Sequence, residues 1–367
     1  MTIAATPNKR FHFKSFQAAI GFFFLGIFLP GLSRAQKNEP VQFIKDKSGE
    51  KIDVLMGGKP FTSFLFPDTL EKPVLYPLIA ADGQIVTRGF PIHPLPEEPT
   101  DHPHHLGLWL NFENVNGLDF WNNSYAIPSE KKHLYGWIKT DRILETKNGP
   151  TGKLTYHANW TNQQNDILLE ETTTYEFSGH DHQRIIDRVT VLKANTAVTF
   201  KDAKDGMLGI RLAHELQIPA VQDQSFKDDK GNVTIVKATK DKIATGNYLT
   251  STGKTGDDAW STRAAWCMAY GKMGNDSVSV IIMDHPGNPN YPAFWHARGY
   301  GLFAVNPLGE KIFTNGKSEK NLHLSKGDSV RFYYRIVIED GKTVISTAAI
   351  NKLATQFAAK DPAALAQ

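Results

Sequence analysis

Apolar and polar residues alternate with a period of two through most of the chain. Residues 330–339 (VRFYYRIVIE) place aliphatic and aromatic side chains on one face and arginine, tyrosine and glutamate on the other, which predicts a half-buried strand. Residues 278–284 (VSVIIMD) are more uniformly apolar and predict a second, shorter strand. Residues 168–177 and 184–194 are rich in β-branched and aromatic residues and flank the sequence SGHDHQ, which predicts a hairpin.

Turn sequences such as ADGQ, KNGPTGK, KDDKGN and EDGK interrupt the chain at short intervals. Helical spacing of apolar residues is present near the C-terminus, in residues 344–359. Many strands and few helices predict an all-β fold, here a large antiparallel two-sheet sandwich with a short C-terminal helix. We expect a single β domain over 36–345, followed by the helix and a tail over 346–367.

The N-terminus has the pattern of a secretory signal peptide. Basic residues precede the apolar run 18–29, and small residues follow at Ser33 and Ala35. The run is shorter than the roughly 20 residues of a typical membrane span. We therefore expect residues 1–35 to be removed after Ala35 and the mature protein to be periplasmic or extracellular, with no later membrane span. An uncleaved N-terminal anchor is the alternative.

Composition narrows the classes of function. The net charge is +3 and the basic residues are scattered, so the chain shows no basic stripe of the kind that binds nucleic acid. A single cysteine, Cys267, excludes a disulfide framework and a cysteine-rich zinc site. The sequence contains no phosphate-binding glycine loop and no G-x-S-x-G motif, so we expect no nucleotide cofactor. The oligomeric state is left open.

Histidines are concentrated in the sequence DHPHH, residues 101–105. Pro103 favours an extended conformation at His102, and in an extended chain the rings of His102 and His104 share a face while His105 points the other way. Neutral imidazoles bind metals, exchange protons near neutral pH, or hydrogen-bond a polyol. A hydrogen-bonded loop without a functional role is the alternative.

One metal-binding pattern can be tested directly. A cupin places a glutamate four or five residues after its His-x-His pair. Those positions hold Leu108 and Trp109 here, and Glu113 follows too late. We therefore expect no bound metal, although a site with distant ligands stays open.

Two further segments carry candidate site residues. Residues 283–307 repeat the Asp-His-Pro triplet and follow a predicted strand, which is where sites usually form. In residues 205–217, strand alternation places Arg211 and Glu215 on one face, either as part of a site or as an exposed ion pair. Arg88 lies upstream of the first histidine cluster and is a further candidate for its lining.

Five segments together resemble a known bacterial family. They are KPVLYPLIAADGQIVTRGFP, DHPHHLGLWLNFENVNGLDFW, GIRLAHE, DHPGNPNYPAFWHARGYGLFAVNP and LSKGDSVRFYYRIVI. The chain is similar, over about residues 40–340, to a secreted family of unknown function labelled "methane oxygenase PmoA" (PmoA-like). The resemblance implies a galactose-mutarotase-type β-supersandwich from bacteria that degrade plant polysaccharides, with functional motifs at 101–105, Arg211 and 284–306. Particulate methane monooxygenase subunits are bundles of membrane helices, which the β pattern of this chain does not match.

The mixture of tryptophans with Asn, Asp, Arg and His suits a carbohydrate, whose C–H faces and hydroxyl edges match such side chains. We therefore expect a secreted carbohydrate-active enzyme of the epimerase, lyase or hydrolase type that uses acid–base catalysis. The alternatives are a non-catalytic carbohydrate-binding protein and a metal-dependent oxygenase. The candidate catalytic residues are His102, His104, Glu215, Asp284 and His285. The candidate substrate-binding residues are Arg88, His105, Trp109, Arg211, Asn288, Trp295, His296 and Arg298.

Overall fold

The computed structural model describes residues 1, 2, 4, 38–96, 98–227, 233–238 and 243–361. The predicted signal peptide lies, apart from its first few residues, outside this described part. Its cleavage and the export of the protein stay predictions.

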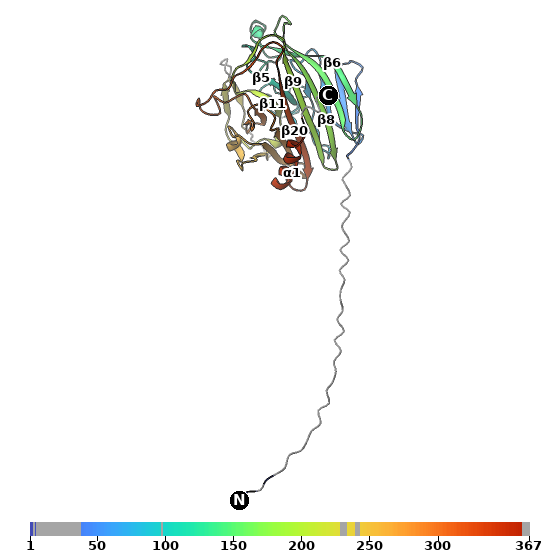
Figure 1. Ribbon diagram of the computed structural model, residues 1–367, viewed down its shortest axis with the longest axis vertical. Coiled ribbons are helices and arrows are strands. Elements are labelled where there is room, and N and C mark those ends of the chain that lie inside the picture. Colours follow the sequence, from blue (N-terminus) through green and yellow to red (C-terminus); the bar gives the residue numbers. More distant parts are fainter. Residues whose placement is uncertain (3, 5–37, 97, 228–232, 239–242, 362–367) are drawn as a thin grey trace. The chain divides into compact units, whose positions relative to one another are not determined.

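Two antiparallel eight-stranded sheets form the body of residues 37–367 (Figure 1). The first sheet has the order β1 (Val41–Lys45), β2 (Lys51–Met56), β3 (Lys59–Leu65), β4 (Val74–Leu75), β5 (Leu108–Phe112), β11 (Gly206–Arg211), β18 (Leu302–Asn306) and β17 (Phe294–Ala297). The second has the order β14 (Asn247–Thr250), β15 (Trp266–Met273), β16 (Asp276–Asp284), β20 (Ser329–Gly341), β9 (Gln183–Ala194), β8 (Ile167–His180), β7 (Gly152–Thr161) and β6 (Trp137–Lys147).

Short elements complete the fold. They are the strand pairs β10 (Val198–Phe200) with β19 (Leu322–Leu324) and β12 (Gln224–Lys227) with β13 (Val233–Val236), the 3₁₀ turns η1 (Ser129–Leu134), η2 (His214–Leu216) and η3 (Gly256–Ala259), and the helix α1 (Thr347–Ala358). The all-β sandwich with a short C-terminal helix is confirmed, as is the hairpin, which is formed by β8 and β9.

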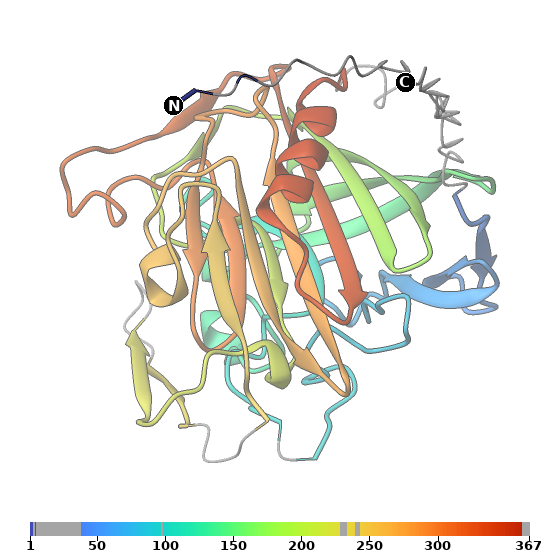
Figure 2. The same ribbon diagram turned by 90° about the horizontal axis from the view of Figure 1, so that it is seen from below.

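The main core lies between the two sheets, where alternate residues of each strand meet. In β20, Tyr334, Ile336 and Ile338 face this core, as their alternation predicted. The opposite face of β20 is covered as well, because Tyr333 and Val337 pack with residues of α1 in a second cluster. Figure 2 shows α1 lying over the strands of this sheet. The strand predicted for 330–339 is confirmed, but its half-buried character is wrong, since α1 covers much of the face expected to meet solvent.

Helix α1 begins where the sequence supplies a cap. The Ser346 side chain accepts a hydrogen bond from the backbone N–H of Ala349 at 3.3 Å, which satisfies one of the unpaired donors of the first turn. Ile350 and Phe357 lie on one side of the helix and are buried against the second sheet. The predicted helix is confirmed, and its apolar side is the one that packs.

The core also contains a buried ion pair between neighbouring strands of the second sheet. Arg188 Nη2 donates to Glu171 Oε1 at 3.1 Å, and both side chains are 1% exposed. Glu171 also accepts from Tyr156 Oη at 2.7 Å, Trp160 Nε1 at 2.8 Å and Thr173 Oγ1 at 2.7 Å. The carboxylate therefore has the several donors that a buried charge requires.

Candidate functional site

A cavity of about 270 Å³ lies over the outer face of the first sheet, on the side away from the main core. On the four neighbouring strands β5, β11, β18 and β17, alternate residues point outward beneath it. Tryptophan side chains fill part of this face, and Gly209 makes room for them, because a Cβ there would lie 2.6 Å from Trp109 and 2.9 Å from Trp121. The polar and aromatic residues that line the cavity include His102, His104, His105, Trp121, Lys131, Tyr135, Lys204, Asp205, His296, Arg298 and Tyr300.

The residues 101–105 form a turn instead of the extended segment that we expected. His102 has φ of 46°, in the left-handed region, and its carbonyl accepts a hydrogen bond from the His105 N–H at 3.0 Å. The rings of His102 and His105 are consequently stacked at 4.7 Å, whereas His104 lies nearly perpendicular to His102 at 5.6 Å. The predicted shared face of His102 and His104 is wrong, because the turn overrides the extended preference of the residue before proline.

A guanidinium from the segment between β4 and β5 holds this turn in place. Arg88 Nη1 donates to the carbonyl of Asp101 at 2.7 Å, and Arg88 Nη2 donates to that of His102 at 3.0 Å. Arg88 is buried, and its role is to fix the backbone of the turn. The left-handed conformation of a non-glycine residue costs about 1–3 kcal/mol, so it persists only where surrounding contacts such as these determine it.

Asp101 and His102 form a buried acid–imidazole pair. His102 Nδ1 lies 2.5 Å from Asp101 Oδ2, and Arg211 Nη2 donates to both oxygens of the same carboxylate, at 2.9 and 2.7 Å. Burial alone would raise the pKa of Asp101, but the guanidiniums of Arg211 and Arg88 and the His102 hydrogen bond outweigh it and hold the pKa well below its usual range. Asp101 is therefore a carboxylate that orients the ring of His102.

Aromatic rings support the pair from both sides. Tyr300 stacks on His102 at 5.0 Å, and His105 stacks in turn on Trp109 at 5.3 Å. The Arg211 guanidinium lies over the Tyr300 ring at 4.8 Å. The site therefore offers ordered rings and fixed hydrogen-bonding groups within one wall of the cavity.

A second acid–imidazole pair borders the same cavity. His296 Nδ1 on β17 lies 3.2 Å from Oδ1 of Asp205, the residue that directly precedes β11. Burial lowers the pKa of His296 to about 4, although Asp205 opposes this shift. Burial would raise the pKa of Asp205, but Lys204 and His296 lower it well below its usual range. At neutral pH this pair consists of a carboxylate and a neutral imidazole.

The other cavity histidines are neutral as well. Burial lowers the pKa of His102 by more than its Asp101 partner raises it. Burial, together with neighbouring basic groups, lowers the pKa values of His104 and His105 well below the ordinary value. These imidazoles therefore act as proton acceptors or hydrogen-bonding groups at neutral pH.

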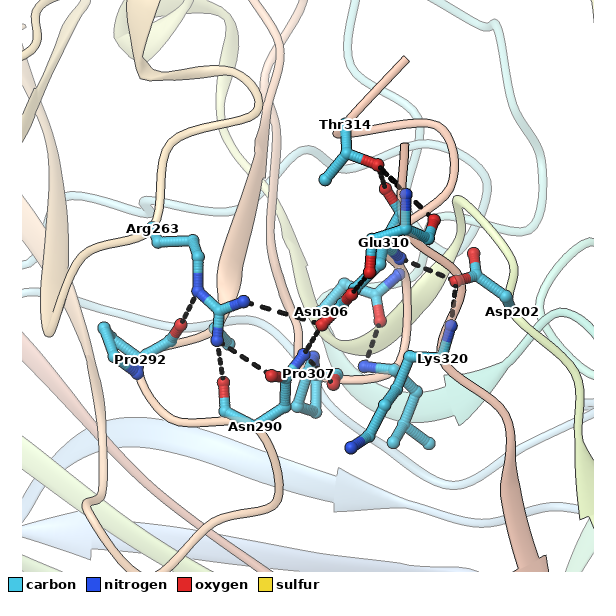
Figure 3. A network of polar contacts seen from close by, with 12 residues as sticks. Asp202, Arg263, Asn290, Pro292, Asn306, Pro307, Glu310, Thr314 and Lys320 are labelled. Atoms are coloured by element: carbon cyan, nitrogen blue, oxygen red, sulfur yellow. Dashed lines mark hydrogen bonds and ion pairs between the residues drawn. The ribbon is translucent and has the colours of Figure 1, made fainter. Parts of the chain in front are cut away.

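The segment that carries Asp205 is anchored by the network drawn in Figure 3. Asn306 at the end of β18 donates to the carbonyls of Ala203 and Lys204, both at 2.9 Å. Nearby, Asn290 receives hydrogen bonds from Arg263 at 2.7 and 2.8 Å and donates to Glu310 at 2.8 Å. Asn290, Asn306 and Glu310 lie outside the lining of the cavity, and Asn306 positions the segment that carries Asp205.

The structure brings together several of the predicted site residues. His102, His104, His105, His296 and Arg298 line the cavity, and Arg88, Trp109 and Arg211 support them from behind. Their functional roles stay predictions. The sequence analysis missed Asp205, which stands at the start of the segment 205–217 that we interpreted through Arg211. It also missed Lys204 and Lys131, which no motif or periodicity singles out, and Tyr300, which lies within the motif 284–306 but was not chosen from it.

Asp284 and His285 lie elsewhere, and their predicted place at this concavity is wrong. Asp284 ends β16 in the second sheet, where it accepts hydrogen bonds from Asn288 Nδ2 at 2.7 Å and the Ala293 N–H at 2.9 Å. His285 packs against Phe357 of α1 and lies 3.2 Å from the Lys360 carbonyl. The Asp-His-Pro repeat therefore closes two different loops on two different sheets.

Three other predicted residues are also away from the cavity. Trp295 faces the main core and donates to the Ala264 carbonyl at 2.9 Å. Asn288 ties the loop after β16 to β20 through two 2.7 Å bonds with the backbone of Tyr333. Glu215 lies on η2 and not on a strand. Strand β11 ends at Arg211, the Ala213 N–H then donates to the Val86 carbonyl, and His214–Leu216 form a 3₁₀ turn.

The structural assignment of Asp284 has a measurable consequence. Burial raises the pKa of Asp284 from 3.8 to about 7, against its hydrogen bonds. Between these values the folded state holds a proton that the unfolded state has lost, so the unfolding free energy falls as pH rises. We expect the stability of the wild type relative to Asp284→Asn, measured by urea unfolding, to decrease from about pH 4 to about pH 7. The buried histidines contribute equally to the pH dependence of the unfolding free energy in both proteins, so their contribution cancels in the difference. A difference that is constant with pH would contradict the assignment.

Two kinds of feature are absent from the described residues. Within the described part of the chain, no group of three or more His, Cys, Asp or Glu side chains is placed to hold a metal ion. No helix among the described residues has the length and apolar character needed to cross a membrane.

Comparison with solved structures finds similarity to carbohydrate enzymes and their homologues. The GH36 α-galactosidase AgaB from Geobacillus stearothermophilus is 8% identical with a TM-score of 0.35, and the alignment covers 82% of this chain and 41% of that one. The GalM/aldose epimerase homologue from C. elegans is 13% identical with a TM-score of 0.31, covering 83% and 100%. The Slr1438 protein from Synechocystis sp. PCC 6803 is 9% identical with a TM-score of 0.31, covering 83% and 96%. The chain thus spans less than half the length of the galactosidase.

No curated protein matches the sequence of this chain. A family match extends from the second strand of the first sheet into α1, and it includes every residue of the cavity described above. The description of that family assigns no activity and does not carry the methane oxygenase label. With residues 51–355 matched, the chain belongs to the family described as a family of unknown function, DUF6807.

Proposed function

We propose that this protein is a carbohydrate-active enzyme that uses acid–base catalysis in the cavity over the first sheet. The observation that carries the proposal is that two acid–imidazole pairs, Asp101–His102 and Asp205–His296, border one cavity of about 270 Å³. Pairs of titratable groups held in defined protonation states are what proton transfer to and from a substrate requires. Aromatic rings in the same lining match the C–H faces of a sugar.

The geometry supports a division of roles. Asp101, kept anionic by Arg211, accepts a hydrogen bond from the Nδ1–H group of His102, which fixes the tautomer in which Nε2 carries the lone pair. His102 is therefore suited to be the general base. Once protonated by the substrate, His102 is also the group that can return the proton, and the neutral His296 and His104, which line the same cavity, are suited to hydrogen-bond the substrate. They replace Glu215, Asp284 and His285 of the sequence prediction, which lie elsewhere.

We also propose that the protein is exported through residues 1–35 and acts outside the cytoplasm. Such a location suits an enzyme that meets glycans in the surroundings of the cell. Edman sequencing of protein recovered from the periplasm or the medium tests the proposal, because the sequence should begin after Ala35.

Turnover on a panel of glycans tests the proposed activity. We expect the purified mature protein to convert at least one glycan or sugar, detected by NMR as a changed anomeric or ring signal, and to do so after treatment with a chelator. Binding without any conversion across the panel would instead identify a non-catalytic carbohydrate-binding protein. Stoichiometric iron, copper or zinc, lost together with activity on chelation, would favour the metal-dependent oxygenase.

A further inference from the structure

The cavity carries more positive than negative side chains. Lys131 on η1, Lys204 before β11 and Arg298 after β17 all contribute to its lining, whereas Asp205 is the carboxylate of that lining among the described residues. The histidines add no charge at neutral pH, since burial lowers their pKa values. The lining is therefore cationic at the pH at which the proposed chemistry takes place.

The layer of residues behind the lining adds carboxylates as well as cations. Arg88 faces the carboxylates of Glu98 and of Asp101, the latter at 3.4 Å, and Arg211 faces Asp101 at 2.7 Å. Lys72 donates to the carbonyl of His104 at 2.8 Å, with Glu71 and Asp119 as its charged neighbours. On the other side, Glu113 accepts the Asp205 N–H at 3.1 Å and adds one further negative charge. The excess of cations therefore lies in the described residues of the lining, which is the layer that a ligand contacts.

The cationic side chains are held in place by their surroundings. The Arg298 guanidinium lies 3.9 Å from the centre of the Trp260 ring, and the Arg298 carbonyl accepts a hydrogen bond from Tyr248 Oη at 3.0 Å. Lys204 Nζ lies 3.4 Å from Asp205 Oδ2, within the second acid–imidazole pair. A cation fixed within a partly closed cavity attracts an anionic group more strongly than one on an open surface, because less water screens it.

We infer that the substrate is an acidic sugar, a carbohydrate unit that carries a carboxylate or a sulfate ester, and that Arg298, Lys204 and Lys131 bind its anionic group. The inference rests on the proposed carbohydrate function and specifies its substrate class. Guanidinium and ammonium groups are the partners that proteins use for carboxylate and sulfate oxygens. The neutral imidazoles of the two pairs then interact with the ring of the same sugar.

Isothermal titration calorimetry with matched ligands tests the inference. The ligands are glucuronate, its methyl ester, glucose, glucose 6-sulfate, and acetate with inorganic sulfate as anions without a sugar. We expect glucuronate or glucose 6-sulfate to bind about tenfold or more tightly than glucose, and the methyl ester, which differs from glucuronate by the charge, to bind like glucose. A neutral sugar that binds as tightly as both acidic ones would overturn the inference while leaving the carbohydrate function intact.

Variants assign the effect to the named residues. Arg298→Gln and Lys204→Gln should each weaken binding of the acidic sugar about tenfold or more and leave binding of the neutral sugar almost unchanged. Lys153→Gln, on β7 of the second sheet, is the matched control. Thermal unfolding of each variant checks that the fold is retained. Loss of affinity for both sugars alike, in a folded variant, would contradict the assignment.

The same titrations separate the inference from the proposed function. Acetate or inorganic sulfate that binds as tightly as the acidic sugars would show a cationic site with no use for a sugar ring, which refutes the carbohydrate function and with it the substrate class. Preference for glucuronate over glucose 6-sulfate, or the reverse, identifies the anionic group, and either result supports the inference.

Discussion

His102→Gln is expected to lower kcat on the active glycan by about 10²–10⁴-fold, the range that a positioned general base contributes. Glutamine preserves much of the volume and the hydrogen bond to Asp101 but cannot take up a proton near neutral pH. Steady-state kinetics measure the effect. Because the substitution leaves the Arg211–Asp101 contacts in place, the thermal unfolding midpoint should change much less than kcat does.

Two companion variants make this result specific. Asp101→Asn should also reduce kcat, since the amide no longer fixes the His102 tautomer and leaves Arg211 without its carboxylate. His133→Gln changes an exposed histidine of η1 and serves as the matched control. If His102→Gln retained the kcat of the wild type, the Asp101–His102 pair would have no catalytic part, whatever the cavity binds.

Arg188→Met is expected to destabilise the protein by about 3–5 kcal/mol, because it leaves the buried Glu171 carboxylate without its counter-charge. Urea unfolding measures the change. Glu171→Met should cost a similar amount, since it also deprives Tyr156, Trp160 and Thr173 of their acceptor. The double variant should cost less than the sum of the two, as is found when both partners of a buried pair are replaced by apolar side chains.

The matched control is Arg142→Met on strand β6, whose partner Asp141 is exposed to solvent like Arg142 itself. Screening by water keeps such surface pairs to about 0–1 kcal/mol, so the two arginines should differ clearly. Equal effects of Arg188→Met and Arg142→Met would show that the Glu171–Arg188 pair contributes no more to stability than a surface contact.

The fold class could be predicted from the sequence because the pattern that specifies it is local. Alternation over 168–177 and 184–194 defines two strands, and the short turn between them determines that they pair. The three-to-four-residue spacing of 344–359 defines α1 in the same way. What these patterns do not encode is which face a distant element covers, so 330–339 was expected to meet solvent on the side that α1 occupies.

The candidate site depended on information that no local pattern contains. The histidines of 101–105 were noticed because they are adjacent in sequence, yet their arrangement follows from Arg88, in the segment before them, and from Arg211 on β11. Asp205 directly precedes β11 and His296 lies on β17. The two side chains are close because β18 is the one strand between β11 and β17 in the sheet order.

The two Asp-His-Pro triplets show the same limit most clearly. Their sequences are identical, but Asp101 is held by two guanidiniums beside a cavity, and Asp284 accepts hydrogen bonds from a side-chain amide and a backbone N–H at the end of β16. The first carboxyl has a lowered pKa and the second a raised one. Sequence alone determined the strands, the helix and the residue types available for chemistry. The tertiary structure decided which carboxyl is charged, because burial and neighbouring charges come from residues far away in the chain.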